Sequence, residues 1–126
     1  MKYKLIFLFA ISIFIQLFLI SCRGEEVGGS TYFLDNQSAY DLTSKSWGIE
    51  VIVNSGEKLE IGGAASFGGN PGLVGQLVLY RDSLGTEIVA YEQIPVVESL
   101  WLVDVIDDSQ YGSIYYTLIV IDAMIK

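Results

Sequence analysis

Turn-forming residues divide the sequence from Thr31 to the C-terminus into short apolar runs, and this spacing limits what the chain can fold into. The runs are rich in Val, Ile and Tyr, which favour strands, and clusters of Asn, Asp, Ser and Gly separate them. About seven such runs fit an all-β fold, an antiparallel two-sheet sandwich of the immunoglobulin-like type. A small closed barrel is the alternative.

The expected strands are short. They are residues 31–35, 41–47, 49–53, 57–61, 76–81, 86–92 and 111–122. The last run is long enough for a helix, but its β-branched residues and tyrosines favour a strand. Residues 96–106 fit either a strand or a short buried helix, and Val103 and Val105 favour a strand from about residue 101.

Two pairs of runs predict hairpins. Asn54-Ser55-Gly56 separates residues 49–53 from 57–61, with Gly56 at a position that needs positive φ. Asp82-Ser83-Leu84-Gly85 separates residues 76–81 from 86–92. Both faces of the second hairpin are apolar, which predicts a central place in its sheet.

The only cysteine, Cys22, stands at the boundary between an apolar run and a charged stretch. Residues 5–20 are almost wholly apolar and follow Lys2 and Lys4, which is the layout of a secretory signal. As a helix the run would span about 24 Å, short for a bilayer core of about 30 Å. A retained membrane anchor is the alternative.

The sequence Leu19-Ile20-Ser21-Cys22 resembles the bacterial lipobox. The resemblance implies cleavage before Cys22, linkage of its thiol to diacylglycerol and acylation of the new N-terminus, for example with palmitate. Residues 1–21 are then a lipoprotein signal peptide. Residues 22–30, with three glycines and no periodicity, are the lipidated cysteine and a flexible tether, and residues 31–126 are the β-sandwich domain.

Three further stretches of the sequence contribute to a wider resemblance: "TYFLDNQSAYDL", "NSGEKLEI" and "YYTLIVID". Together they are similar to the small, uncharacterised β-sandwich lipoproteins of Bacteroidetes. The resemblance implies an outer-membrane location, at the periplasmic face or the cell surface, and no established activity. The stretch Arg23-Gly24-Glu25-Glu26 looks like the surface signal of such lipoproteins; the alternative is that it keeps the linker soluble.

The mature chain is strongly acidic. Lys2 and Lys4 lie in the signal, so five basic residues remain against 15 acidic ones, a formal charge of −10. Such a surface repels phosphates, which argues against a nucleic-acid partner. We expect a monomeric domain, attached to the membrane by its lipid, with an envelope protein or a glycan as partner.

The residue types present restrict the chemistry. The sequence has no histidine, and lipidation of Cys22 leaves no free thiol, so His- and Cys-based catalysis and metal ligation are excluded. Asp104, Asp107 and Asp108 offer oxygen ligands for Ca²⁺, but their spacing does not fit a calcium loop, and an acidic turn is the simpler interpretation. We therefore expect a non-enzymatic protein without cofactor or metal.

Three aromatic residues are candidate ligand-binding residues: Phe67, Trp47 and Trp101. Phe67 lies in the Gly-rich segment 62–75, which is either an exposed binding loop or, as we favour, a flexible connection. The tryptophans are candidate stacking platforms for sugars, and at least one is expected in the core. The predicted function is a lipid-anchored, non-catalytic binding or structural accessory domain of the cell envelope. The alternative is a carbohydrate-binding module with exposed aromatics.

Overall fold

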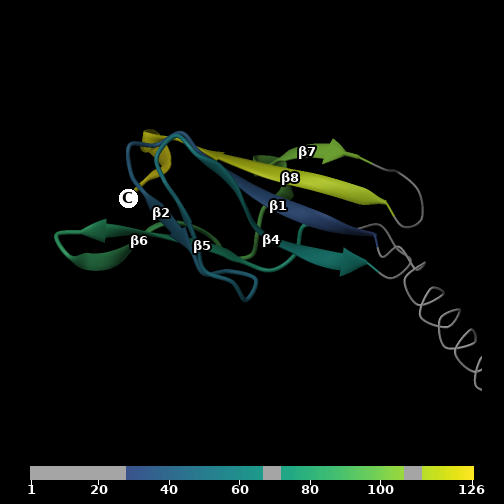
Figure 1. Cartoon of the computed structure of the whole chain (residues 1–126), viewed down its shortest axis with the longest axis horizontal. Helices are drawn as coiled ribbons and strands as arrows, with labels where there is room; N and C mark the ends of the chain where they lie inside the picture. Colours follow the sequence, from purple (N-terminus) through teal and green to yellow (C-terminus); the bar gives the residue numbers. More distant parts are fainter. Residues whose placement is uncertain (1–27, 67–71, 107–111) are drawn as a thin grey trace, which may run out of the picture.

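Two four-stranded sheets pack face to face in the computed structural model, which describes residues 28–66, 72–106 and 112–126 (Figure 1). The strands are β1 (Gly28–Asn36), β2 (Leu42–Ser44), β3 (Val51–Val53), β4 (Lys58–Ser66), β5 (Leu77–Ser83), β6 (Thr86–Gln93), β7 (Leu102–Val105) and β8 (Ser113–Val120). Two 3₁₀ turns, η1 (Glu98–Leu100) and η2 (Asp122–Met124), complete the described elements. The predicted two-sheet β-sandwich is confirmed, with eight strands in place of about seven.

The first and last strands are neighbours in one sheet. The β1 sheet has the order β4-β1-β8-β7, and the β5 sheet has the order β3-β2-β5-β6. All pairs are antiparallel except β1 with β8, which are parallel. In immunoglobulin constant domains the first and last strands lie in different sheets, so this strand order differs from theirs.

Alternation along β1 builds one wall of the core. Tyr32 and Leu34 are fully buried, whereas Thr31, Phe33 and Asp35, which alternate with them, face outward and are half-buried, because successive side chains point to opposite faces of a sheet. The same alternation holds on β8. Buried apolar side chains from the other elements complete the core: Leu42, Val53, Ile61, Leu77, Leu79, Ala90, Trp101, Tyr116, Leu118 and Val120.

The hairpin predicted for residues 49–61 is wrong. Gly56 does have a positive φ of 83°, but β3 pairs with β2 and β4 pairs with β1, so the turn carries the chain from one sheet to the other. The buried Asn36 explains this: its amide donates to the carbonyl of Val53 (2.9 Å), and its backbone N–H donates to the carbonyl of Glu57 (2.9 Å). Asn36 thereby joins the end of β3 to the β1 sheet.

The second hairpin is confirmed, but its predicted central place holds for β5 and not for β6. Its two-residue turn is Leu84-Gly85, with φ values of 52° and 82°, as a tight hairpin turn requires. β6 is an edge strand. Its outward residue Val89 is more than a third exposed, so the apolar character of both faces does not reflect burial on both sides.

Two predicted boundaries also need correction. Gly28–Ser30 belong to β1 and not to a tether, and a Cβ on Gly29 would lie 2.8 Å from the carbonyl oxygen of Ala64. Residues 62–66 belong to β4 and not to a flexible connection, because they pair with the start of β1. Residues 96–106 form η1 and then β7, which confirms a strand from about residue 101.

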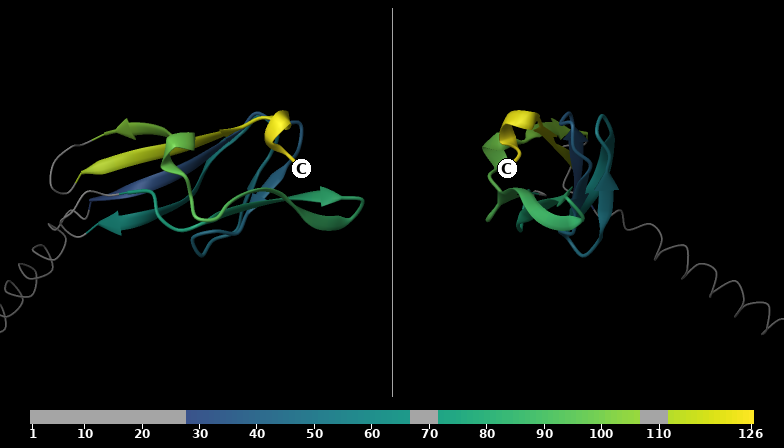
Figure 2. Two further views of the ribbon diagram at one scale, coloured as in Figure 1. Left: turned by 180° about the vertical axis from the view of Figure 1, so that it is seen from behind. Right: turned by 90° about the vertical axis from the view of Figure 1, so that its left-hand side faces the viewer.

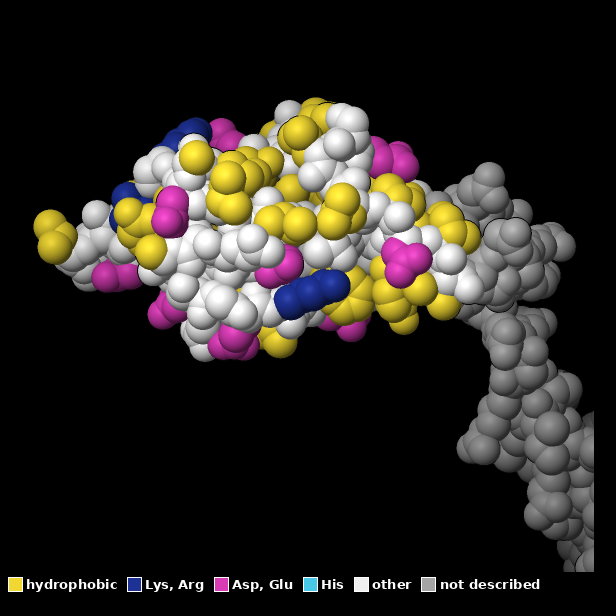
Figure 3. All heavy atoms as spheres, turned by 90° about the horizontal axis from the view of Figure 1, so that it is seen from above, with side chains coloured by type: hydrophobic (Ala, Val, Ile, Leu, Met, Phe, Trp, Pro, Cys, Tyr) yellow, Lys and Arg dark blue, Asp and Glu magenta, His cyan; other side chains and the backbone are white. Residues whose placement is uncertain are grey.

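The strand pairings define two ends of the sandwich. Gly28 pairs with Ser66, and the start of β8 and the end of β7 lie beside them; we call this the β1 end. The C-terminus and the turn of the β5–β6 hairpin lie toward the opposite end (Figure 2). Hydrophobic side chains, with acidic ones among them, remain visible on the side of the molecule where β7 and β8 lie (Figure 3).

Candidate functional site

Trp47 occupies the turn that follows β2 and packs over two glycines. It has a positive φ of 54° and is followed by Gly48, with a φ of 77°; a bulky residue seldom adopts this conformation. The indole N–H donates to the carbonyl of Val74 (2.9 Å). A Cβ on Gly62 would lie 2.7 Å from the Trp47 ring, and one on Gly75 would lie 3.1 Å from its Nε1 atom. The glycines therefore make room for this side chain.

The tryptophans join two tyrosines in one aromatic cluster. The ring of Tyr32 lies 4.6 Å from Trp47, 6.2 Å from Trp101 and 5.9 Å from Tyr116, measured between centroids. Trp101 is only 4% exposed, and its indole N–H donates to Oε1 of Gln93 (2.9 Å). The expectation that at least one tryptophan lies in the core is confirmed. Trp101 presents no open face for a sugar, and we remove it from the candidate ligand-binding residues.

The described part of the Gly-rich segment after β4 is held by hydrogen bonds. The carbonyl of Gly72 accepts from the hydroxyls of Ser30 (2.7 Å) and Tyr32 (2.8 Å), and the N–H of Val74 donates to the Tyr32 hydroxyl (3.2 Å). This stretch is therefore fixed against β1, contrary to the expectation of a flexible connection. Phe67, the third candidate residue, lies outside the described residues.

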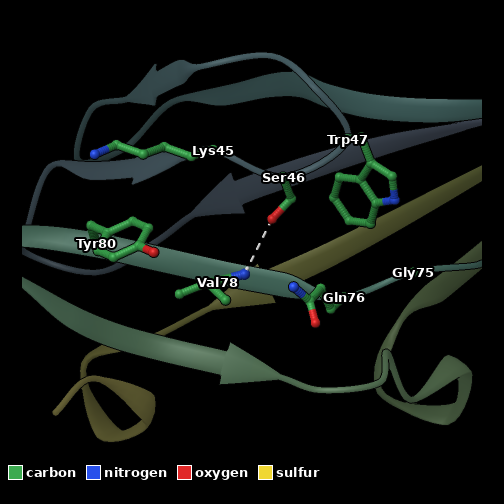
Figure 4. Close-up of a pocket in the computed structure, with 7 residues that line it drawn as sticks. All are labelled: Lys45, Ser46, Trp47, Gly75, Gln76, Val78 and Tyr80. Atoms are coloured by element: carbon green, nitrogen blue, oxygen red, sulfur yellow. Dashed lines mark hydrogen bonds between the residues drawn. The ribbon is translucent and has the colours of Figure 1, made fainter.

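A pocket of about 350 Å³ opens on the outer face of the β5 sheet, where the end of β2 meets the start of β5 (Figure 4). We call it the β2–β5 pocket. Its lining residues are Lys45, Ser46, Trp47, Gly75, Gln76, Val78 and Tyr80. Val78 and Tyr80 face outward because they alternate with the buried Leu77 and Leu79. The N–H of Val78 donates to the hydroxyl of Ser46 (3.2 Å), which ties the two sides together.

The rim of the β2–β5 pocket carries an ion pair. The ammonium of Lys45 lies 4.9 Å from the centroid of the Tyr80 ring and forms an exposed ion pair with Glu87. The hydrogen bond to Glu87 raises the pKa of Lys45 above its ordinary value. Ammonium, amide and hydroxyl groups beside aromatic rings can bind a small polar molecule by hydrogen bonding and stacking.

Sequence analysis predicted Trp47 at this site and missed Lys45, Gln76 and Tyr80. The outward direction of Tyr80 follows from the alternation in residues 76–81. That alternation does not show that β2 is the neighbour of β5, with Thr43 opposite Tyr80 and Ser44 opposite Leu79. The strand pairing, and not any local pattern, creates the pocket.

The carboxylates do not form a metal centre among the described residues. Asp104 is exposed on β7, and Asp107 and Asp108 lie outside the described residues. Within the ranges that the structure describes, no three acidic or thiol side chains come together as metal ligands. The same ranges contain no helix with the length and apolar character needed to cross a membrane.

No protein-family model matches the chain, and neither the curated proteins nor the solved structures include a significant match. The similarity to β-sandwich lipoproteins of Bacteroidetes therefore stays a prediction from the sequence. A functional assignment has to rest on the position of Cys22 and on the geometry of the sandwich.

Proposed function

We propose that this chain is a lipid-anchored cell-envelope protein whose β-sandwich is a non-catalytic binding or structural accessory domain. The observation that carries the proposal is the position of Cys22. It ends an apolar run of the signal type and lies six residues before Gly28, where β1 begins. Six residues extend over about 20 Å at most, so lipid on Cys22 would hold the β1 end beside the membrane. Several acyl chains together give a stable anchor.

The placement of β1 supports this role. β1 is hydrogen-bonded to β4 on one side and to β8 on the other, so the tether leads into the interior of a sheet and not into an edge strand. The opposite end, toward which the C-terminus and the β5–β6 turn lie, would then face away from the membrane (Figure 2). That end is where a partner in the envelope could approach.

The acidic surface limits the partners. A formal charge of −10 on the mature chain disfavours nucleic acids and anionic headgroups, so attachment depends on the lipid. We assign the protein to the outer membrane, at its periplasmic face or the cell surface, as a monomeric domain that meets an envelope protein or a glycan.

Substitution of Cys22 by serine tests the anchor. Cells fed labelled palmitate should label the wild-type protein and recover it in the membrane fraction. The Cys22→Ser protein should be unlabelled and should remain uncleaved or mislocalised. Ser21→Ala, which keeps a small residue before the cysteine, is the matched control and should be labelled normally. Label on the Cys22→Ser protein would show that the lipobox interpretation is wrong.

A second candidate function is carbohydrate binding, and the β2–β5 pocket is the observation that favours it. Its aromatic walls, Trp47 and Tyr80, and its polar groups suit a small polyol. Binding on a glycan array should weaken at least about tenfold in Tyr80→Ala, because a stacking contact is lost. Tyr115→Ala, on the outer face of the β1 sheet, is the matched control and should bind as the wild type does. Equal glycan binding by both variants would show that the β2–β5 pocket is not the carbohydrate-binding site.

A further inference from the structure

The outer edge of the β1 sheet is formed by β7, a strand with exposed apolar side chains. β7 pairs with β8 on one side, and none of the described strands pairs with its other side (Figure 1). Leu102, Val103 and Val105 are 48–61% exposed, and Ile106, the next residue, is 53% exposed. Natural proteins normally protect such an edge with charge, proline or a covering segment, because its free backbone groups pair readily with another chain.

The backbone of β7 has groups free for such pairing. The N–H of Ile106 donates to the carbonyl of Ser113 on β8 (2.9 Å). Hydrogen-bonded positions alternate along an antiparallel ladder, so Asp104 also directs its N–H and C=O toward β8. The N–H and C=O groups of Val103 and Val105 therefore point to the free edge, where a further strand could bond to them.

The side chains of β7 define what that strand should carry. Val103 pairs with Tyr116 on the core side, yet it is about half exposed, so the β5 sheet does not cover it. Val105 lies on the same side. Asp104 pairs with Tyr115 on the outer face. An added strand would place apolar side chains beside the two valines and, between them, one side chain beside the aspartate.

The negative charge of Asp104 favours a basic side chain at the position of the added strand that lies beside it. Asp104 lies on β7 and Glu98 lies in η1 just before it, and neither element carries a lysine or arginine. The space-filling view shows acidic side chains among the hydrophobic ones on the side where β7 lies, together with Lys or Arg side chains (Figure 3). Pairing of two copies through β7 with the two Asp104 side chains opposite each other would bring like charges together, which is unfavourable.

We propose that β7 is a docking site for an extended segment of a partner protein, which joins the β1 sheet as a further strand. The segment has the pattern apolar–basic–apolar, with its basic residue beside Asp104 and its apolar residues beside Val103 and Val105. Main-chain hydrogen bonds would give affinity, and the alternating side chains would give specificity. This inference does not depend on the lipid anchor or on the β2–β5 pocket.

Two fluorescein-labelled peptides test the proposal, with the full-length protein in detergent micelles and anisotropy as the readout. The probe is fluorescein-Gly-Thr-Val-Lys-Val-Thr-amide, with the dye on the N-terminal amine so that the lysine keeps its charge, and the control peptide has Glu in place of Lys. The lysine peptide should bind at least about tenfold more tightly, because its charge opposes that of Asp104. Asp104→Lys should reverse the order of the two peptides. Equal binding of the two peptides, or no binding of either, would overturn the proposal.

Two lysine substitutions localise the binding. Val103→Lys should weaken binding of the lysine peptide at least about tenfold, because a lysine protects a sheet edge from pairing. Ile52→Lys introduces the same charge on β3, an exposed edge strand of the other sheet, and should change binding less than about twofold. Circular dichroism checks that both variants fold. An equal loss in both would contradict docking at β7.

A second copy of this chain or a lipid surface could cover β7 instead. Experiments distinguish these two cases, and either result would overturn the proposal. Wild-type protein that self-associates in sedimentation experiments, and loses this property in Val103→Lys, would assign the edge to a second copy. Wild-type protein that binds the lysine peptide in detergent micelles, but not once it is reconstituted into uncharged phosphatidylcholine vesicles, would assign the edge to a lipid surface.

Discussion

The indole ring of Trp47 lies against Gly62 so closely that a Cβ on this glycine would come within 2.7 Å of it. Gly62 pairs with Tyr32 on the neighbouring strand, and the Tyr32 ring lies 4.6 Å from that of Trp47. A turn of the β5 sheet thus fills the space above a glycine of the β1 sheet. This contact joins the two sheets and makes the glycine necessary.

Replacement of Gly62 by alanine should therefore destabilise the fold. The added methyl group would overlap both the ring and the Cβ of Trp47, and we expect a loss of about 1–3 kcal/mol in the free energy of unfolding. Urea denaturation followed by tryptophan fluorescence measures it. Gly72→Ala is the matched control: apart from its chain neighbours, none of the described residues has an atom within 4 Å of its added Cβ, and the change should stay within about 1 kcal/mol. Equal effects at both positions would contradict the packing described.

Removal of the Tyr32 hydroxyl should release the described end of the Gly-rich segment, residues 72–75. This hydroxyl donates to the carbonyl of Gly72 and accepts from the N–H of Val74. Tyr32→Phe should cost about 1–3 kcal/mol, because those partners lose a hydrogen bond. In Tyr115→Phe, which changes an exposed tyrosine, the cost should stay within about 0.5 kcal/mol. If Tyr32→Phe is as stable as the wild type, the hydroxyl does not hold this stretch in solution.

The turn of the β5–β6 hairpin carries a removable strain. Leu84 has a φ of 52° and a fully exposed side chain. Leu84→Asn should raise the free energy of unfolding by about 0.5–1 kcal/mol, since asparagine adopts this conformation at a lower energetic cost than leucine. Leu84→Ala keeps the strain and should leave the thermal midpoint unchanged. A lower midpoint for Leu84→Asn would show that the leucine makes a contact that the structure does not contain.

Alkaline pH should destabilise the protein through Tyr116. Burial raises the pKa of this phenol above its ordinary value of 10.0, and the Glu98 carboxylate nearby raises it further. The folded state thus favours the neutral phenol. Its contribution to stability is complete below pH 10 and is lost as the pH rises through the higher pKa of the folded state.

Urea denaturation between about pH 8 and pH 11 tests this linkage. The free energy of unfolding should fall with pH in the upper part of this range, and the fall should be shallower in Tyr116→Phe. Tyr115→Phe, which removes an exposed neighbour, should follow the wild-type curve. Parallel curves for wild type and Tyr116→Phe would exclude Tyr116 as the group responsible.

The sequence predicted those features that depend on alternation and turn chemistry. The faces of β1 and β8 follow from period-two patterns, and the β5–β6 turn follows from Gly85. These are local properties, because each side chain direction depends on its neighbours along the strand. The all-β fold class followed from the same signals.

Strand pairing could not be predicted in the same way. The turn at Gly56 has the composition of a hairpin turn, but the hydrogen bonds of Asn36 direct it across the sandwich. Nothing in the local pattern of residue 36 shows that its side chain will meet Val53. The β2–β5 pocket and the contact of Trp47 with Gly62 were missed for the same reason: both arise where distant segments meet.

The parallel pairing of β1 with β8 also sets the order of events during synthesis. Gly29 lies opposite Ser113, so the first described strand finds one of its two neighbours only when nearly the whole chain has emerged. Until then β1 has an open side, and the core around Tyr32 is incomplete. Pairings between residues so far apart slow folding, because the intervening loop has to close first. A nascent chain of this kind cannot complete its β1 sheet until its last strand is made, and a chain without its complete fold is easier to thread through a narrow channel than the finished sandwich.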